Sequence, residues 1–204
     1  LYTVGITALQ LLSCTMVAYG LARYAYPGSR LVFLLMIFTL VIPPQTYMSG
    51  LYVQFRFWDP FGLVTALTGS TGVTNTFVPF ILQAVLCQGL RNGLYVFLMR
   101  QYFRNLPGEL EEAAKIDGAG DYTVLFRIMV PLATPIIAVI ALYYMVGIWN
   151  NYFTPMLYLN KRSLFPLQLF LREILIQNNT ASITASQSDS AQAYAENVKY
   201  AIIV

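Results

Sequence analysis

The sequence predicts an all-α fold, a polytopic bundle of membrane-spanning helices, and two observations carry this prediction. Hydrophobic residues make up 57% of the 204 residues and charged residues only 10%, with a mean hydropathy of +0.60. A soluble domain usually carries about 25% charged residues, and a chain of this size has too little interior to hide so much apolar surface. The apolar residues also form runs close to the roughly 20 that a helix needs to cross a bilayer, without the alternation of barrel strands.

The first two spans are predicted at the start of the chain. Residues 2–22 form an apolar run that ends at Arg23. After a short turn, residues 31–48 form the second run. Pro43 and Pro44 lie inside it. Because proline lacks a backbone donor and clashes with the preceding turn, we expect these two residues to kink or end the helix.

The rest of the chain alternates polar segments with apolar ones. The third span is the least regular, because polar side chains interrupt it at Gln83, Gln88, Arg91 and Asn92. In order, the predicted segments are a polar and aromatic loop at 50–75, a third span at 76–99, a charged amphipathic segment at 100–129, a fourth span at 131–152, a polar stretch at 160–197 and the start of a fifth span.

Basic residues indicate how the spans are oriented, since they favour the cytoplasmic ends of membrane helices. Arg23 and Arg30 flank the first turn. A second basic group lies between the third and fourth spans, at Arg100, Arg104, Lys115 and Arg127. Alternating spans place both groups on one side, which we predict to be cytoplasmic. The opposite loops also hold basic residues, so the bias is modest.

The residue inventory excludes several kinds of chemistry. The chain has no histidine, which excludes histidine-based triads and histidine metal ligands. Cys14 and Cys87 lie alone in apolar segments and form neither a metal-ligand nor a disulfide pattern. The Walker A pattern is absent, so this chain has no ATPase site of its own. We therefore predict no catalytic residues, no metal, no cofactor and no nucleic-acid partner.

A charged segment at about 105–131 predicts two short helices on the cytoplasmic side. Pro107 suits the first turn of the first helix. Three carboxylates follow it, where the helix dipole favours anions: Glu109, Glu111 and Glu112. Glu111 precedes Lys115 by four residues, and we expect these two side chains to pair.

The other end of this helix has a cap and a small-residue face. Gly118 suits a left-handed C-terminal cap, and we expect Asp121 to cap a second helix at 122–129. One helical face is predicted to carry Leu110, Ala113, Ala114 and Asp117. Such a face fits a groove on another protein. The alternative is a helix that lies on lipid headgroups, which usually carries more Lys and Arg.

This segment resembles the EAA loop of ABC importer permeases. That family's pattern is Glu-Ala-Ala, then Asp-Gly, then Ile-x-x-Pro before a membrane helix. Here the pattern is Glu112 to Ala114, Asp117 with Gly118, and Ile128 with Pro131. The stretches IPPQTYMSGLYVQFRFWD, GLRNGLYVFLMRQYFRNLP and WNNYFTP resemble the carbohydrate-uptake, maltose-type branch. The tail PLQLFLREIL with ENVKYAIIV resembles subunits for complex or plant-derived saccharides.

The resemblance implies a function and a set of partners. It implies a multi-pass permease subunit of a bacterial inner membrane, which imports sugars or oligosaccharides with a second permease subunit, a cytoplasmic ATPase dimer and an extracytoplasmic solute-binding protein. Because such subunits usually have six spans, residues 1–204 are expected to be a transmembrane domain that is incomplete at both ends. The implied ATPase-coupling residues are Glu109, Glu112, Ala113, Ala114, Asp117 and Gly118.

Five residues are candidates for the substrate path: Arg91, Asn92, Trp149, Asn150 and Tyr152. A charge at membrane depth is costly, so Arg91 either binds substrate or holds a structural carbonyl. The aromatic and amide side chains at the end of the fourth span suit a sugar, but they also fit an interfacial aromatic belt. Gly89 and Gly93 have the GxxxG spacing, which either permits close helix packing or is incidental.

Two other function classes are weighed against the importer. A secondary transporter or channel would need acidic relays inside the spans, and the spans contain no acidic residue. A membrane-embedded enzyme would need a clustered catalytic set, and none is visible. A permease for a non-sugar solute would share the EAA loop, so the assignment to sugars depends on the resemblance outside that loop.

Overall fold

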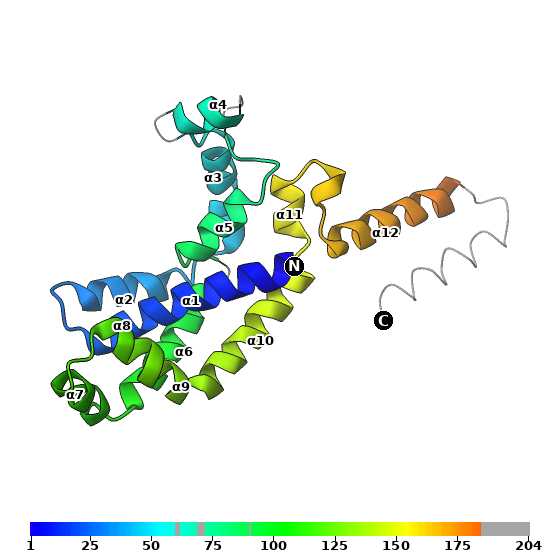
Figure 1. Ribbon diagram of the computed structural model, residues 1–204. Coiled ribbons are helices and arrows are strands. Elements are labelled where there is room, and N and C mark those ends of the chain that lie inside the picture. The colour runs from blue at the N-terminus through cyan, green and yellow to red at the C-terminus, as the bar shows by residue number, and fades with distance from the viewer. Residues whose placement is uncertain (60–61, 69–71, 90, 185–204) are drawn as a thin grey trace. The chain divides into compact units, whose positions relative to one another are not determined.

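The computed structural model describes residues 1–59, 62–68, 72–89 and 91–184 (Figure 1), and it confirms the all-α fold, since these residues contain no strand. The chain divides into two compact units, one of residues 1–73 and 77–148, the other of residues 74–76 and those from Trp149 on. The elements are α1 (Tyr2–Arg23), α2 (Ser29–Phe38), α3 (Pro44–Arg56), α4 (Leu63–Thr68), α5 (Val78–Val85), α6 (Asn92–Asn105), α7 (Glu109–Ile116), α8 (Asp121–Val124), the π-helix η2 (Leu125–Met129), α9 (Val130–Leu132), α10 (Thr134–Asn150), α11 (Phe153–Tyr158), the 3-10 helix η3 (Arg162–Leu164) and α12 (Leu167–Thr184).

The first predicted span is confirmed as a single helix. α1 has 22 residues and is long and apolar enough to cross a membrane. It packs against both α5 and α6. One polar contact to α5 is the Ser13 hydroxyl, which donates to the carbonyl oxygen of Ala84 over 2.6 Å.

The second predicted span, residues 31–48, is not one helix. α2 ends at Phe38, before the proline pair, and a turn leads to α3, with Pro43 as its N-cap and Pro44 as its first residue. This placement satisfies proline, which has no backbone N–H to donate and fits the first helical turn. The run is broken, as expected, but α2 ends at Phe38, five positions before Pro43, and the prolines begin the next helix. α3 also runs to Arg56, into the predicted loop at 50–75, which additionally contains α4.

The third predicted span, residues 76–99, is also broken. α5 ends at Val85 and α6 begins at Asn92. Cys87 and Arg91 in the connection have positive φ values of 54° and 68°, in the left-handed region that terminates a helix. The single continuous helix was wrong, and polar contacts occupy the break. Nε2 of Gln10 in α1 donates to the carbonyl oxygen of Gln88 and to Oδ1 of Asn92, and Nδ2 of Asn92 donates to Sγ of Cys87.

The fourth span is bent where it begins. α8, η2 and α9 lead into α10, and the axes of the two helical stretches 121–132 and 134–150 differ by 83°. Pro131 lies in the short α9 just before the bend. By length and composition, α1 alone passes as a spanning helix among the described residues, or two spans pass if the bent pair counts as one. Multi-pass insertion therefore remains a prediction.

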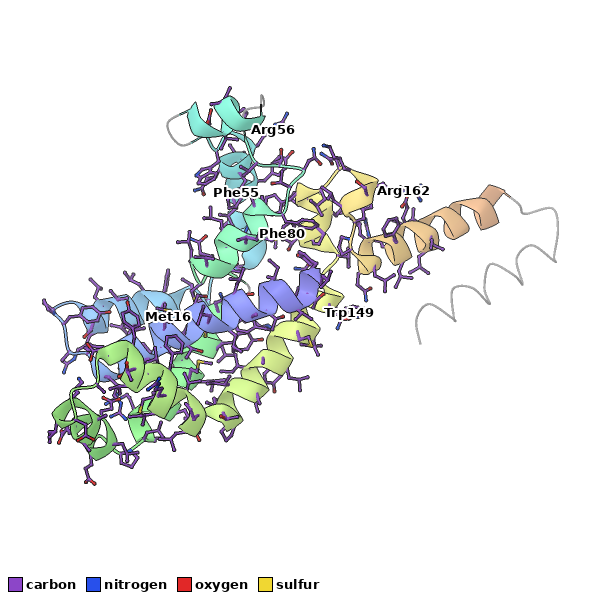
Figure 2. All side chains as sticks on the ribbon, viewed as in Figure 1. Met16, Phe55, Arg56, Phe80, Trp149 and Arg162 are labelled. Atoms are coloured by element: carbon purple, nitrogen blue, oxygen red, sulfur yellow. The ribbon has the colours of Figure 1, made fainter. Side chains whose placement is uncertain are left out.

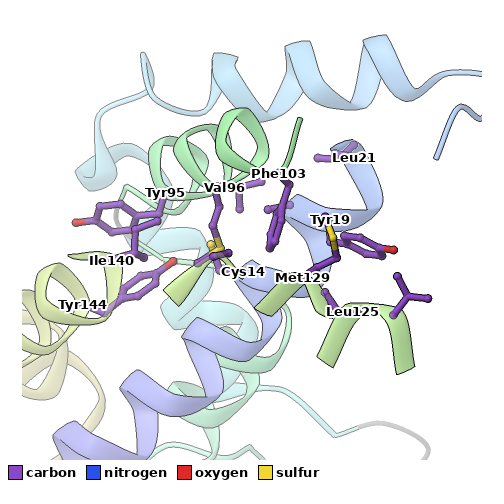
Figure 3. Close-up of a cluster of buried hydrophobic side chains, with 14 of the residues drawn as sticks. Cys14, Tyr19, Leu21, Tyr95, Val96, Phe103, Leu125, Met129, Ile140 and Tyr144 are labelled. Atoms are coloured by element: carbon purple, nitrogen blue, oxygen red, sulfur yellow. The ribbon is translucent and has the colours of Figure 1, made fainter. Parts of the chain in front are cut away.

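One contiguous core holds the larger unit together. Figure 3 shows its buried side chains, with Tyr95, Ile140 and Tyr144 on one side of Cys14, and Phe103 and Met129 on the other. Its fully buried members, with 0% exposure, include Cys14, Met99, Phe103, Met129 and Ile140. Because these residues come from α1, α6, η2 and α10, the core fixes the helices that surround the charged segment.

The smaller unit contains α11, η3 and α12. The amide nitrogen of Asn75 donates to the carbonyl oxygen of Tyr158 over 2.9 Å, so residues 74–76 belong to this unit. An ion pair of 3.3 Å joins Arg162 to Glu173 of α12. α12 runs through residues 167–184, where the sequence predicted a polar stretch, and the rest of that stretch lies outside the described residues.

Candidate functional site

The charged segment folds as two helices, as predicted, and its first helix is α7. α7 begins at Glu109 with Gly108 as its N-cap, so Pro107 precedes the helix and does not lie in its first turn. The first turn carries Glu109, Glu111 and Glu112. Their carboxylates face the positive end of the helix dipole, which stabilises this short helix.

The end of α7 is a complete Schellman motif around Gly118. The amide nitrogen of Ala119 donates to the carbonyl oxygen of Ala114 over 2.9 Å, and that of Gly118 donates to Lys115 over 3.1 Å. Gly118 has a φ of +81°, a conformation that strains residues with a side chain. The predicted left-handed cap at Gly118 is confirmed.

The ion pairs of α7 differ from the prediction. Glu111 does not pair with Lys115 in its own helix. Its Oε1 lies 3.0 Å from Nε of Arg23, at the end of α1. Lys115 pairs instead with Asp121, over 3.4 Å. Asp121 is the first residue of α8 and makes no side-chain cap hydrogen bond, so the predicted capping role of Asp121 was wrong.

α7 turns one face to its own chain and the other outward. Glu111 and Ala114, three positions apart, are its buried residues. Ala114 therefore does not share an outward face with Ala113, because a helix rotates about 100° per residue. The other predicted coupling residues are exposed: Glu109, Glu112, Ala113, Asp117 and Gly118.

Apolar side chains extend this outward surface. Ile116 is 86% exposed, and Tyr122 of α8 is 70% exposed. Large exposed apolar residues beside acidic ones are typical of a surface that contacts another protein. Figure 1 shows α7 and α8 at the end of the unit where α1 ends and α2 begins, which is the predicted cytoplasmic side.

Tyr24, directly after Arg23, contacts both α7 and α8. Burial, aided by a hydrogen bond to the Asp121 carboxylate, raises the pKa of the Tyr24 hydroxyl. The ammonium of Lys115 lies 5.8 Å from the centre of the Tyr24 ring. The end of α1 thus contacts α7 and α8 through polar groups on both sides.

The five candidates for the substrate path have different surroundings in the structure. Asn92 is buried, and its Oδ1 accepts a hydrogen bond of 3.0 Å from Nε2 of Gln10 in α1. Arg91 is exposed and has a left-handed backbone that starts α6. These two neighbours in sequence therefore have different surroundings: the amide of Asn92 has a partner inside the protein, whereas Arg91 is an exposed residue.

The remaining three candidates lie where α10 ends. Trp149, labelled in Figure 2, is half exposed, and Asn150 is also exposed. Tyr152 is 43% exposed, and the guanidinium of Arg172 lies 5.1 Å from the centre of its ring. Arg172 also lines a pocket together with Met156, Phe165 and Glu173. Arg172 is not among the residues that the sequence predicted for the substrate path.

The glycine pair of the third span has a packing role. A Cβ at Gly93 would lie 2.8 Å from the carbonyl oxygen of Met36, and one at Gly89 would lie 2.4 Å from Nε2 of Gln10. Gly93 therefore lets the backbone of α2 approach closely, whereas Gly89 leaves room for the Gln10 side chain. Gly89, however, precedes α6, so the pair does not lie on one helix as a GxxxG motif would.

Sequence reasoning missed two residues of this region, Arg23 and Gln10. Arg23 was interpreted only as a topology signal, although a charge that directly ends an apolar span must find a partner or water. Gln10 is a lone amide within an apolar run, and that isolation was the available signal.

Comparisons with known proteins agree with the geometry. The family described as "Binding-protein-dependent transport system inner membrane component" matches residues 15–202. Protein LplC of Bacillus subtilis is 33% identical over 99% of this chain and 62% of its own length. The polygalacturonan/rhamnogalacturonan transport system permease protein YtcP of the same species is 32% identical over 97% of this chain and 63% of its own length.

A solved structure is also similar. The crystal structure of a bacterial ABC transporter involved in the import of the acidic polysaccharide alginate contains a chain with a TM-score of 0.67 and 25% identity, which covers 97% of this chain and 67% of that one. By comparison, the chain spans somewhat less than two thirds of the length of each of the two Bacillus relatives.

Proposed function

The chain belongs to the family of binding-protein-dependent transport system inner membrane components, and from this premise we propose that it is a permease subunit of an ATP-driven importer of sugars or oligosaccharides. Its relatives' names support the substrate class. Polygalacturonan/rhamnogalacturonan transport is named for one, and arabinooligosaccharide transport for AraQ of Halalkalibacterium halodurans, which is 34% identical over 85% of this chain and 56% of its own length.

The proposal includes a multi-pass position in the bacterial inner membrane and three kinds of partner. A cytoplasmic ATPase dimer supplies the energy, a second permease subunit completes the pathway, and an extracytoplasmic solute-binding protein delivers the sugar. This chain performs no catalysis itself. The family description, which names binding-protein-dependent transport, supports the delivery step.

The observation that carries the coupling role is the exposed face of α7. Glu109, Glu112, Ala113 and Asp117 point away from the chain's own core, and Ile116 stands among them. Buried Ala114 and the Gly118 cap hold this face in place. A stiff, exposed helix at the cytoplasmic end is what a coupling element needs, since its contacts must change with the state of the ATPase.

Transport then follows because the position of the bound α7 depends on the state of the ATPase. The ATPase dimer binds the α7 face in both its open and closed states, and closure draws the segment along. The bent junction between α9 and α10 lies directly after this segment, so displacement of α7 and α8 reaches the fourth span through it. We also propose that Arg91, Asn92, Trp149, Asn150 and Tyr152 contribute to the substrate path, and that Asn92 does so by holding the Gln10 amide in place.

The test uses the full-length subunit, tagged and co-expressed with the ATPase and the second permease. We expect the ATPase to co-purify with the wild type, and Glu112→Lys or Gly118→Asp to abolish that association while membrane insertion is retained. Lys161→Glu, a charge reversal of equal size at an exposed position of the smaller unit, serves as the control and should leave association unchanged.

If the ATPase never co-purifies, or if both α7 variants behave like the wild type, the coupling role is wrong. A secondary transporter would then be the better explanation. Co-purification that is lost equally in Lys161→Glu would show a general defect and would also count against the α7 surface.

A further inference from the structure

Arg23 lies between the first predicted span and the segment that carries α7. Its guanidinium makes two contacts outside its own helix. Nε lies 3.0 Å from Oε1 of Glu111, and Nη2 donates to the carbonyl oxygen of Leu106 over 2.8 Å. Only 15% of the Arg23 side chain and 11% of the Glu111 side chain are exposed.

The two contacts hold both ends of one short connection. Leu106 is the C-cap of α6, and Glu111 lies in the first turn of α7. Between them, Gly108 lies so close to Arg23 that a Cβ there would be 3.8 Å from Nη1. The Arg23 side chain at the end of α1 therefore contacts both the end of α6 and the first turn of α7.

The Arg23–Glu111 contact is an ion pair and not an aligned hydrogen bond. Nε and Oε1 are close enough to bond, but the N–H of Nε does not point at Oε1. The aligned hydrogen bond of Arg23 goes to Leu106. Partly desolvated ion pairs add little net stability, but removal of one partner leaves the other charge without compensation. Such a pair therefore fixes position more than it adds stability.

Besides the Arg23 contacts, α7 is held by the exposed ion pair of Lys115 with Asp121 and by its buried face. Glu111 and Ala114 are its buried residues, and an alanine contact alone allows the helix to rotate or slide. The second polar link from the end of α1 runs from Tyr24 to Lys115, near the other end of α7. In contrast to α7, α1 is a continuous helix of 22 residues, which acts as a stiff rod about 33 Å long.

We propose that Arg23 is a positioning residue that transmits movement of α7 to α1. When the ATPase displaces α7, the Arg23–Glu111 pair obliges the end of α1 to follow, so the first span moves with the docked helix. The proposal rests on the proposed function, because it assumes an ATPase that docks on the outward face of α7. The pair itself lies on the opposite, buried face and does not need to contact the ATPase.

The test uses the complete assembly of full-length subunits in lipid nanodiscs, with and without ATP and vanadate, followed by hydrogen–deuterium exchange. The variants are Arg23→Gln, Glu111→Gln and the charge swap Arg23→Glu/Glu111→Arg. Arg30→Gln is the matched control, since Arg30 is an exposed arginine at the start of α2, just after the turn that follows Arg23. Co-purification of the ATPase is measured for every variant.

In the wild type, nucleotide should change the exchange of the α7 amides and of the last turn of α1 together, by about threefold or more. In Arg23→Gln and Glu111→Gln, the ATPase should still co-purify and α7 should still respond, but the response of α1 should disappear. The charge swap should restore the response of α1, which a general packing defect would not do. Arg30→Gln should resemble the wild type.

The proposal is overturned if α1 still responds to nucleotide in both single variants, or if the swap is recovered from the membrane but leaves α1 unresponsive. If the single variants fail to fold, the swap decides alone, and a swap that also fails counts against an exchangeable pair. Failure of the proposed function looks different, because the ATPase would then be absent from the purified wild type.

Discussion

Replacement of Gly118 by alanine should weaken binding of the ATPase, and the structure limits by how much. A Cβ at this position would meet no atom within 4 Å, so a steric clash does not contribute. The cost comes from the backbone alone, since φ is +81° and a left-handed conformation costs a residue with a side chain about 1–2 kcal/mol.

This cost sets the expected affinity. The Schellman bonds at Ala119 and Gly118 hold the turn in place, and a penalty of about 1–2 kcal/mol against them lowers the population of the native turn by at most about 5–30-fold. The apparent dissociation constant rises by the same factor, because the ATPase binds only the fraction with α7 in the native orientation. Asparagine, which tolerates this conformation, should cost less than alanine, and β-branched valine should cost more.

The measurement is the affinity of the purified ATPase for the full-length permease pair in nanodiscs, for Gly118→Asn, Gly118→Ala and Gly118→Val. Gly120→Ala is the matched control, since Gly120 has a φ of −71° and equally open surroundings. It should bind within about twofold of the wild type. If Gly120→Ala weakens binding as much as Gly118→Ala, or if valine is tolerated as well as asparagine, backbone conformation is not the reason.

Two further predictions concern the packing of the membrane helices. Gly93→Ala should lower the stability of the subunit by about 1–3 kcal/mol, because the new Cβ would lie 2.8 Å from a backbone oxygen of α2. Gly5→Ala is the control and should not lower it, since a Cβ at Gly5 would meet no atom within 4 Å. Thermal melting in detergent compares the two variants, and equal melting temperatures would contradict the close approach at Gly93. Asn92→Leu should destabilise the subunit by about 0.6–1.7 kcal/mol, because Nε2 of Gln10 loses the nearer of its two acceptors. The double variant Gln10→Leu/Asn92→Leu should recover part of that loss in the same assay. A double variant no more stable than Asn92→Leu would show that the amide pair is not the cause.

The elements that local sequence rules decide were predictable. The first span is an unbroken apolar run, and it folds as α1 with an end at Arg23, as predicted. The cap at Gly118 was predictable for the same reason, since glycine after a short amphipathic helix has one dominant use. Both predictions needed only residues that are neighbours in sequence.

The breaks in the second and third spans were harder, because hydropathy averages over a window and does not detect where a helix stops. The residues of α2 are as apolar as those of a spanning helix, yet the helix stops at Phe38, which has 59% of its side chain exposed. In the third span, a polar residue beside the break, Asn92, is bonded to Gln10, which lies 82 positions away in the sequence. No local pattern contains that distance.

The ion pairs of α7 show why the candidate site was only partly predictable. A rule for helix surfaces favours Glu111 with Lys115, and such exposed pairs contribute about 0.2–0.5 kcal/mol. Arg23 offers Glu111 a largely buried partner, where a charge interacts more strongly because less water screens it. Once Glu111 faces inward, helical geometry obliges Glu109, Glu112 and Ala113 to face outward. The tertiary contact thus decides which face of α7 is left for a partner, although the sequence already contained every residue of that face.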